Sequence, residues 1–444
     1  MTRRRYWVYF LLFLMNGISY TDRVNMSLAG HSIATEFHLS SVALGYLFSS
    51  FLWAYVLMML PGGRMIDGLG AHRVATICAT VWSVAQICTG MAGNFWTMLV
   101  ARLGLGIGEA PVSPVTYRSA REWGPHTEHG TAIGVMQSGT LLGPALGAPV
   151  VAWLITVITW RGSFYVTGAA GLLWVVVWTA LVSTPERTRW LPEREREKIL
   201  AERHVAEPSP RYAAEASRHA GGIGYRGLIR SPSMWGLAIS QGCAVYSLYL
   251  YLSWLPNYLQ TVRHVSTLNS GVFTSVPFLV GALVIVVVNK IGDAMLTRNT
   301  MQSGNRRRAV AICLILTAGG MAIPYTPSLT VVVLLTILPI SFSNTATALN
   351  AALTSDLLRS PADAGRAFAF LVLGGNVFGL LAPIVTGYIV QATGSFDSAF
   401  LLAGILALSG AVVSLTLTRH TLGETTPALA RPSGSTANLL HPRR

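Results

Sequence analysis

The chain has 444 residues, of which 52% are hydrophobic and only 11% are charged, and its formal net charge is +14. Soluble globular domains carry about 25% charged residues, so this composition excludes an ordinary soluble enzyme and a disordered chain. Four dispersed cysteines show neither disulfide-like nor metal-like spacing. We expect no metal site, no catalytic residues and no cofactor.

Apolar runs predict twelve transmembrane helices, because about 20 apolar residues cross a bilayer. The runs cover 6–29, 42–62, 74–92, 95–118, 129–157, 161–183, 233–259, 268–290, 308–325, 328–355, 364–391 and 396–418. The predicted fold class is an all-α membrane protein with two six-helix halves. We predict an N-terminal half at 1–183, a cytoplasmic linker at 184–231, a C-terminal half at 232–418 and a disordered tail at 419–444.

Positively charged residues fall almost entirely on one side of the predicted helices. With the N-terminus placed in the cytoplasm, 28 of the 32 Lys and Arg residues lie on the cytoplasmic side, two lie outside and two lie within helices. Cytoplasmic loops are enriched in Lys and Arg, so we predict that both termini are cytoplasmic. The surplus charge therefore indicates orientation, and we expect no nucleic-acid partner.

The middle segment carries a mixed-charge run at 193–198 that follows Pro192. Proline in a first turn and opposite charges four residues apart favour a short helix. Two interpretations stay open at this stage. The helix is either a strap between the two halves or a simple soluble linker.

An acid followed by a base appears after the second and the eighth predicted helix. Asp67 precedes Arg73, and Asp293 precedes Arg298. The two acids lie 226 residues apart, and this offset aligns the halves, as expected for two six-helix repeats.

The stretch 63–73, with its glycines at 63 and 70 around Asp67, resembles the signature between helices 2 and 3 of the major facilitator superfamily. Segments 20–25, 51–55, 102–111 and 254–258 resemble the anion:cation symporter family within it, which includes sugar-acid, phthalate and tartrate permeases. The resemblance implies a monomeric protein of the bacterial inner membrane that moves a small organic anion with protons. It also implies that Asp67, Arg73, Asp293 and Arg298 hold a cytoplasmic gate closed.

Four ionisable side chains lie within predicted helices, namely Asp22, Arg23, Arg102 and Glu109. Each costs about 3 kcal/mol at the centre of a helix in a bilayer, so such residues persist where they pair or face a cavity. Arg102 and Glu109 are seven residues apart and share one face of the fourth helix. We therefore expect them to interact. Asp22 and Arg23 are adjacent and should serve different neighbours.

These four residues suggest the chemistry of transport. An arginine fork binds a carboxylate or sulfonate well in a low-dielectric cavity, and a buried carboxyl can carry a proton. We predict that Arg23 binds the substrate anion, that Asp22 and Glu109 are proton sites, and that Arg102 is a switchable partner of Glu109. Structural ion pairs that tie helices 1 and 4 together are the alternative.

Further substrate contacts follow from the resemblance. Tyr55, Gln137 and Asn376 match positions that line the site in sugar-acid members, and each has packing as its alternative. Apart from the resemblance, Tyr246, Tyr249 and Tyr251 of the seventh predicted helix are candidates for facing the site between the halves, and packing is again the alternative. Thr354 stands where sugar-acid members often have a tryptophan. That departure argues against a hexose-sized acid and leaves room for another small anion, such as a sulfonate.

One feature favours a different direction of transport. The glycines and proline at 139–147 resemble a motif of efflux antiporters in the same superfamily. Close packing of small residues is the alternative reading of this pattern. A proton-driven efflux antiporter is therefore the second functional hypothesis.

Overall fold

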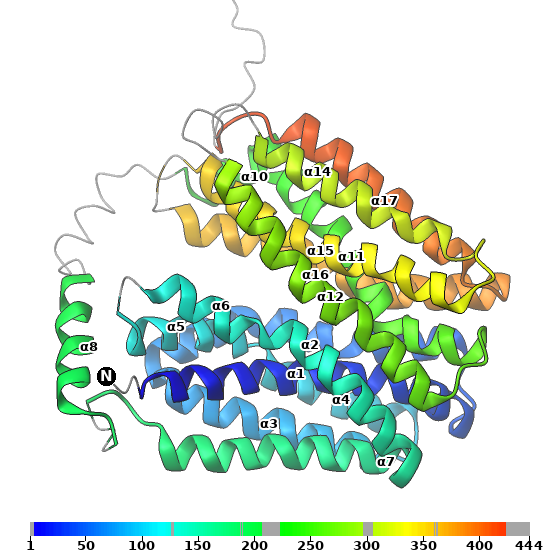
Figure 1. Ribbon diagram of the computed structural model, residues 1–444, viewed down its shortest axis with the longest axis horizontal. Helices are drawn as coiled ribbons and strands as arrows, with labels where there is room; N and C mark the ends of the chain where they lie inside the picture. Colours follow the sequence, from blue (N-terminus) through cyan, green and yellow to red (C-terminus); the bar gives the residue numbers. More distant parts are fainter. Residues whose placement is uncertain are drawn as a thin grey trace, which may run out of the picture.

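The computed structural model describes residues 4–125, 128–186, 188, 190–206, 223–295, 305–358, 360 and 363–422. This part of the chain contains helices and no strands, and Figure 1 shows their order. The elements are α1 (Tyr6–Glu36), α2 (Ser41–Leu69), α3 (Ala71–Met91), α4 (Phe95–Glu109), α5 (Val112–Trp123), α6 (His129–Gln137), α7 (Gly139–Leu181), α8 (Glu193–Ala206), α10 (Gly224–Arg230), α11 (Pro232–Thr261), α12 (Thr267–Met295), α14 (Asn305–Thr317), the 3₁₀ helix η2 (Ala318–Ala322), α15 (Leu329–Leu357), α16 (Ala364–Thr393) and α17 (Asp397–Leu417).

Seven helical segments of the described chain are long and apolar enough to cross a membrane by length and composition. One of them, His129–Leu181, has 53 residues, about 80 Å of helix at 1.5 Å per residue, which is far more than one crossing needs. It crosses twice, because Thr159 has φ 74° and ψ 167° inside it and turns the chain back. The other four crossings are α1, α4 with α5, α11, and α14 with η2. The predicted twelve-helix fold is confirmed.

Local sequence explains where several helices begin and end. Asn94 caps α4, because its side chain accepts a hydrogen bond from the backbone N–H of Thr97. The hydroxyl of Thr97 in turn accepts a hydrogen bond from the backbone N–H of Asn94. Pro111 has no N–H to donate, and the fourth crossing is interrupted there between α4 and α5. Between α2 and α3 the chain turns at Gly70, whose φ is 81°. Such a φ is costly for residues with a side chain.

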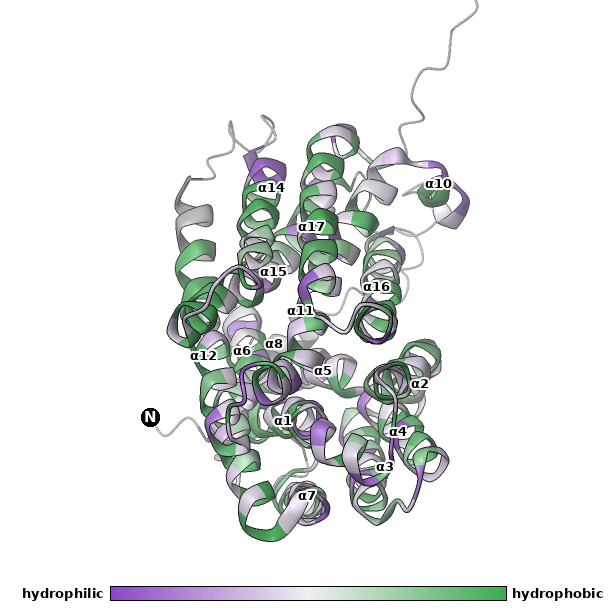
Figure 2. Ribbon diagram, turned by 90° about the vertical axis from the view of Figure 1, so that its right-hand side faces the viewer, coloured by the Kyte–Doolittle hydropathy of each residue, from purple (hydrophilic) through white to green (hydrophobic). Residues whose placement is uncertain are grey.

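The halves form two bundles, with α1–α7 in one and α11–α17 in the other (Figures 1 and 2). Large apolar side chains lie exposed on the outside of both bundles, as expected of surfaces that contact lipid. Leu57, Leu146 and Leu283 are 78%, 63% and 65% exposed. Figure 2 shows hydrophobic residues along most helices.

The two halves pack against each other at the end of the molecule away from the N-terminus, here called the sealed end. Glycines allow the contact. A Cβ at Gly45 would lie 2.5 Å from the carbonyl oxygen of Pro383, and one at Gly271 would lie 2.4 Å from the Cβ of Ala152. Because backbones approach so closely, α2 meets α16 and α12 meets α7.

The linker helix α8 lies beside the N-terminus (Figure 1). Arg5 donates to Glu195 of α8 at 3.2 Å and to Glu128 at 2.7 Å. At the other end of the linker, the Asp363 carboxylate accepts from the backbone N–H groups of Ile223 and Gly224 at 2.8 and 3.2 Å. The linker is thus attached to one half at each described end, and both earlier interpretations of it remain compatible with this arrangement.

Candidate functional site

The glycines of α4 allow the fourth crossing to pack closely against the neighbouring helices α2 and α3. A Cβ at Gly106 would lie 2.0 Å from the carbonyl oxygen of Phe51 in α2, and a Cβ at Gly108 would lie 2.6 Å from the backbone nitrogen of Trp82 in α3. Only glycine fits at such approaches. As a result, Glu109 at the end of α4 is placed in the interior of the N-terminal half, where it is 0% exposed.

Glu109 forms an ion pair with Arg23 of α1. Oε2 of Glu109 accepts from Nε of Arg23 at 2.9 Å and lies 2.8 Å from Nη2. Both side chains are buried, and within the described part of the chain Oε1 of Glu109 has no hydrogen-bond partner. The expectation that Arg102 is the partner of Glu109 is therefore wrong for this conformation. Seven residues along one helix separate the Cα atoms by about 10.5 Å, whereas the neighbouring helix offers a closer cation.

Arg102 forms no ion pair with any residue that the structure describes. Its side chain is 1% exposed, and its Nε and Nη1 atoms have no hydrogen-bond partner among the described residues. The guanidinium carbon lies 5.1 Å from the ring centre of Phe51, and that of Arg23 lies 5.0 Å from the same ring. Two guanidinium groups thus contact one aromatic ring, which offsets part of the cost of their burial through cation–π attraction. A buried polar group without partners is costly, so the hydrogen-bonding capacity of Arg102 is only partly used in this conformation.

Asp22 turns away from Arg23, as adjacent residues of a helix do. Its Oδ1 accepts from Nε2 of Gln86 in α3 at 2.9 Å, and the same amide nitrogen donates to Thr167 of α7 at 3.0 Å. Oδ2 of Asp22 has no hydrogen-bond partner in the described chain, and the residue is 0% exposed. The expectation of different neighbours is confirmed. Gln86 was not predicted from the sequence, although a lone amide within an apolar run is a usable signal.

Residues of both halves surround Arg23. The C-terminal half supplies Tyr249, whose hydroxyl accepts from Nη1 of Arg23 at 3.1 Å. From the N-terminal half, Tyr20 and Tyr55 place their ring centres 4.2 and 5.5 Å from the guanidinium carbon. Tyr55 is thus brought to the charged cluster, as the resemblance implied for its position.

A cavity of about 10 Å³ borders the cluster between the halves, which is room for about one water. It is lined by Arg23, Met26, Ser27, Phe48, Phe51, Arg102, Tyr249, Leu252 and Ser253. The two arginines face the same small space, and residues of α11 close it from the other half.

Gln137 and Asn376 lie away from the ion pair in this conformation. Gln137 donates to the hydroxyl of Tyr117 at 3.2 Å, and Asn376 lies 3.5 Å from the sulfur of Met59. Asn376 therefore touches the opposite half, while Gln137 stays within its own. Their assignment as substrate ligands stays a prediction.

The predicted gating residues are only partly described. Asp67 and Arg73 lie at the ends of α2 and α3, and neither forms an ion pair within the described chain. The side chain of Asp293 and the whole of Arg298 lie outside the described residues. Asp356, near the end of α15, pairs with Arg306 of α14.

The glycines of the antiporter-like motif pack against α1. A Cβ at Gly139 would lie 2.3 Å from the carbonyl oxygen of Phe13, and one at Gly143 would lie 2.4 Å from that of Gly17. Gly147 would in the same way meet the hydroxyl of Thr21 at 2.4 Å. The close-packing interpretation of this motif accounts for all three glycines.

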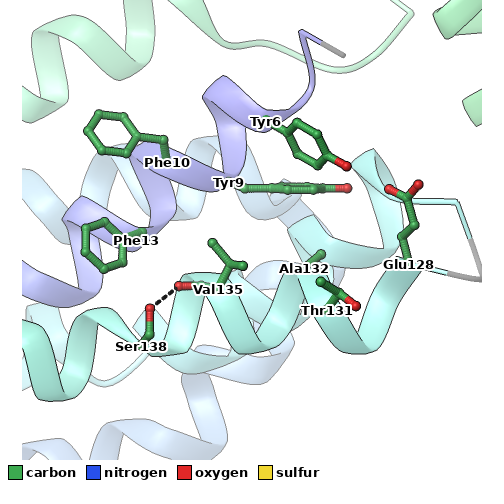
Figure 3. Close-up of a pocket in the computed structure, with 9 residues that line it drawn as sticks. All are labelled: Tyr6, Tyr9, Phe10, Phe13, Glu128, Thr131, Ala132, Val135 and Ser138. Atoms are coloured by element: carbon green, nitrogen blue, oxygen red, sulfur yellow. Dashed lines mark hydrogen bonds between the residues drawn. The ribbon is translucent and has the colours of Figure 1, made fainter. Parts of the chain in front are cut away.

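A larger cavity, of about 640 Å³, lies between α1 and α6 near the N-terminus (Figure 3). Its walls are mainly aromatic and aliphatic, and Figure 3 shows the tyrosine hydroxyls of Tyr6 and Tyr9 near Glu128. Glu128 is the charged residue among those that line it, and its carboxylate is bound by Arg5. Mainly apolar walls with one acidic residue do not fit an anion, so the arginine cluster remains the candidate site.

Comparison with known proteins identifies the family. The model of the Major Facilitator Superfamily matches residues 9–304 and 301–443. The chain belongs to the major facilitator superfamily. It is a multi-pass membrane transporter and not an enzyme.

Curated relatives are transporters of organic acids. The chain is 32% identical to a probable sulfoacetate transporter of Cupriavidus necator, covering 93% of this chain and 94% of that one. It is 29% identical to a D-galactonate transporter of Escherichia coli, covering 92% and 94%. It is 30% identical to a probable galactarate/D-glucarate transporter of Bacillus subtilis, covering 94% and 92%. The predicted membership among anion permeases is confirmed.

Solved structures confirm the fold. A bacterial homologue of the human lysosomal transporter Spinster, in an inward-facing and unoccupied conformation, matches with a TM-score of 0.75 and 18% identity, covering 96% of this chain and all of the other. A D-xylose–proton symporter matches with a TM-score of 0.69 and 16% identity, covering 94% and 99%.

Proposed function

We propose that this transporter takes up a small organic anion together with protons, by alternating access to a site at the arginine cluster. The observation that carries the proposal is the unequal pairing of four buried charges. Arg23 is bound to Glu109, whereas Arg102 holds two unpartnered nitrogens beside it. A cluster with a free buried cation attracts a carboxylate or sulfonate and disfavours cations.

Proton coupling follows from the Arg23–Glu109 pair. An anion that binds Arg23 competes with Glu109 for the same guanidinium. Protonation of Glu109 removes that competition, because a neutral carboxyl no longer needs the cation. Binding of anion and proton would then be mutually favourable, which is what symport requires. Asp22, which accepts from Gln86 and forms no ion pair within the described chain, is the second proton site in this proposal.

The relatives narrow the substrate class. Their names indicate sulfoacetate, galactonate, galactarate and glucarate, so the anion is a small carboxylate or sulfonate. Arg23 and Arg102 would bind its charged group, and Tyr55, Gln137 and Asn376 would contact the remainder. No resident cofactor is needed, since the proton gradient drives transport.

Orientation in the membrane completes the proposal. The distribution of Lys and Arg favours both termini in the cytoplasm of a bacterial inner membrane. The sealed end would then face the periplasm, and the structure would represent an inward-facing state of a monomer. Asp67, Arg73, Asp293 and Arg298 would form the opposite gate after the halves rock.

Uptake into proteoliposomes tests this function. With sulfoacetate, galactonate and glucarate as probes, an imposed inside-alkaline gradient should drive accumulation of at least one anion. Glu109→Gln should lose this acceleration while keeping anion exchange, because the amide cannot release a proton. Glu122→Gln, in a surface pair with Arg118, is the matched control. Uptake that ignores the gradient and is unchanged in Glu109→Gln would refute the proposal.

Efflux antiport is the remaining alternative. Its main sequence support was the glycine motif, and those glycines are used in packing against α1. Export of cationic dyes by the purified protein would favour it over anion uptake.

A further inference from the structure

Two hydrogen bonds join α1 to α11 at positions that correspond between the halves. Arg23 binds Tyr249 at 3.1 Å, and Ser27 Oγ donates to the carbonyl oxygen of Ser253 at 2.7 Å. Each pair is separated by 226 residues, the offset that also relates Asp67 to the acid of the second repeat. Residues that meet their own counterparts lie at the pseudo-symmetry axis between repeats. This junction is therefore where the halves must separate when the sealed end opens.

The guanidinium of Arg23 is divided between the two halves. Nε and Nη2 point to Glu109 of the N-terminal half, and Nη1 points to the hydroxyl of Tyr249 in the C-terminal half. A guanidinium is planar and presents its N–H groups in fixed directions. The direction of Nη1 thus depends on whether Nε and Nη2 stay on Glu109.

Tyr249 is itself held in a defined position. Its ring centre lies 6.3 Å from that of Phe51, and the residue is 8% exposed. Gly379 of α16 makes room for it, since a Cβ there would lie 2.9 Å from Cδ2 of Tyr249. The hydroxyl cannot follow Arg23 far, so a turn of the guanidinium breaks the contact.

We propose that Tyr249 is a positioning residue that makes closure of the sealed end depend on the Arg23–Glu109 pair. This inference rests on the proposed function of that pair. When Arg23 binds Glu109, the Nη1 group of Arg23 donates to Tyr249 and stabilises the sealed end. When an anion binds Arg23 or a proton neutralises Glu109, Arg23 leaves Glu109, the hydrogen bond to Tyr249 is lost, and the sealed end opens more readily. The side chain of Arg23 thus couples the binding site to the gate.

The neighbouring contacts sharpen the test. Gln260 donates to the carbonyl oxygen of Leu28 at 3.3 Å, and Phe48 packs edge-on against Trp254 at 5.1 Å. These contacts also hold the sealed end, but they involve no charged group. Tyr249 differs from them because its partner is the arginine of the site.

Distances across the sealed end give a direct readout. Spin labels would be attached to cysteines at Thr35 and Ser398, which are exposed near this end on opposite halves, in a background that carries Cys88→Ser because Cys88 is exposed. Tyr249→Phe should raise the ratio of open to sealed molecules about tenfold, since a hydrogen bond to a charged group is lost. Tyr251→Phe is the matched control, because its ring stacks on Phe400 within its own half.

Arg23→Lys separates this role from general packing. A lysine can pair with Glu109, but its ammonium is a point charge and has no further N–H group fixed in the direction of Tyr249. Tyr249→Phe should therefore have little further effect on the distances in an Arg23→Lys background. Unchanged distances in Tyr249→Phe, or an equal effect of it in both backgrounds, would overturn the inference. The distance measurement uses no proton gradient and no anion. The role of Tyr249 can therefore be refuted while proton-driven uptake is observed, and uptake can be refuted while the distances behave as expected.

Discussion

Arg23 and Glu109 are 86 residues apart in the chain and form a buried ion pair, with Nη2 of Arg23 2.8 Å from Oε2 of Glu109. The pair joins α1 to the end of α4 within the N-terminal half. Both groups are buried, so a charge left without its partner would be poorly hydrated. Removing one partner of such a pair is more damaging than removing both.

The first prediction concerns the stability of this pair. Arg23→Gln and Glu109→Ala should each lower the free energy of unfolding by about 3–5 kcal/mol, the usual cost of an uncompensated buried charge. The double variant Arg23→Gln/Glu109→Ala should lose clearly less than the two single effects combined. Denaturant titration in detergent micelles would measure all three. Strict additivity would show that the two groups do not interact.

Arg102 leads to a prediction of the opposite sign. Because its Nε and Nη1 atoms lack partners, Arg102→Met should stabilise the empty protein by roughly 1–2 kcal/mol, as apolar replacements of buried charges often do. The same variant should lose the thermal shift that a transported anion produces in the wild-type protein. A trade of stability for binding at one position is typical of functional sites. A destabilised variant that still binds the anion would assign Arg102 a structural role.

Much of this architecture could be predicted from the sequence because lipid imposes simple rules. Twelve apolar runs and the one-sided distribution of Lys and Arg indicated the crossings. Asp22, Arg23, Arg102 and Glu109 stood out because charged residues are rare at that depth. Predicting the contact between Arg23 and Glu109 would have required knowledge of how α1 packs against α4.

What the sequence could not reveal was the partner of each charge. The seven-residue spacing of Arg102 and Glu109 favoured a contact within one helix. In the structure, glycines at 106 and 108 allow α4 to pack closely against α2 and α3, and Glu109 then faces α1. A residue's neighbours across helices depend on these close approaches, which no periodicity encodes. The role of Gln86 as the partner of Asp22 was missed for the same reason.

The glycines that pack against α1 support a third prediction. Gly139→Ala should destabilise the protein by about 1–3 kcal/mol, as overpacking does, because the new Cβ would meet the carbonyl oxygen of Phe13 at 2.3 Å. Gly134→Ala, in the preceding helix, is the control, since nothing lies within 4 Å of its Cβ position. Thermal unfolding of the two variants would compare them directly. Similar losses in both would contradict the close packing of α6–α7 on α1.

The fourth prediction concerns the linker helix. Arg5 is 3% exposed and holds both Glu128 and Glu195, so Arg5→Ala should release α8 from the N-terminal half. Trypsin should then cleave within 193–206 several-fold faster, because local unfolding exposes the backbone. Arg118→Ala removes an ordinary pair within one helix, with Glu122, and should leave the cleavage rate unchanged. Equal rates in wild type and Arg5→Ala would show that α8 is held by other contacts.

The last prediction concerns pH and the loop end of α1. Glu36 accepts from Nη2 of Arg161 at 2.6 Å and from Nε1 of Trp160 at 2.7 Å. The Arg161 hydrogen bond holds the pKa of Glu36 below its ordinary value of 4.5. The unfolded chain therefore binds more protons between the two pKa values, and the contact stabilises the fold only when Glu36 is ionised. Since Glu36 is largely exposed, the pair should contribute about 0.5 kcal/mol.

This stabilisation should be complete well above pH 4.5 and should disappear as the pH falls through the lowered pKa of Glu36. Glu36→Gln is expected to be less stable than wild type at pH 7, and this difference should shrink at pH 3, measured by thermal unfolding at both values. Ser398→Ala, at a neutral exposed residue near the same end, serves as the control and should not show this convergence. A difference between Glu36→Gln and wild type that persists unchanged at pH 3 would mean that the side chain acts by packing, because protonation would then leave its contribution intact.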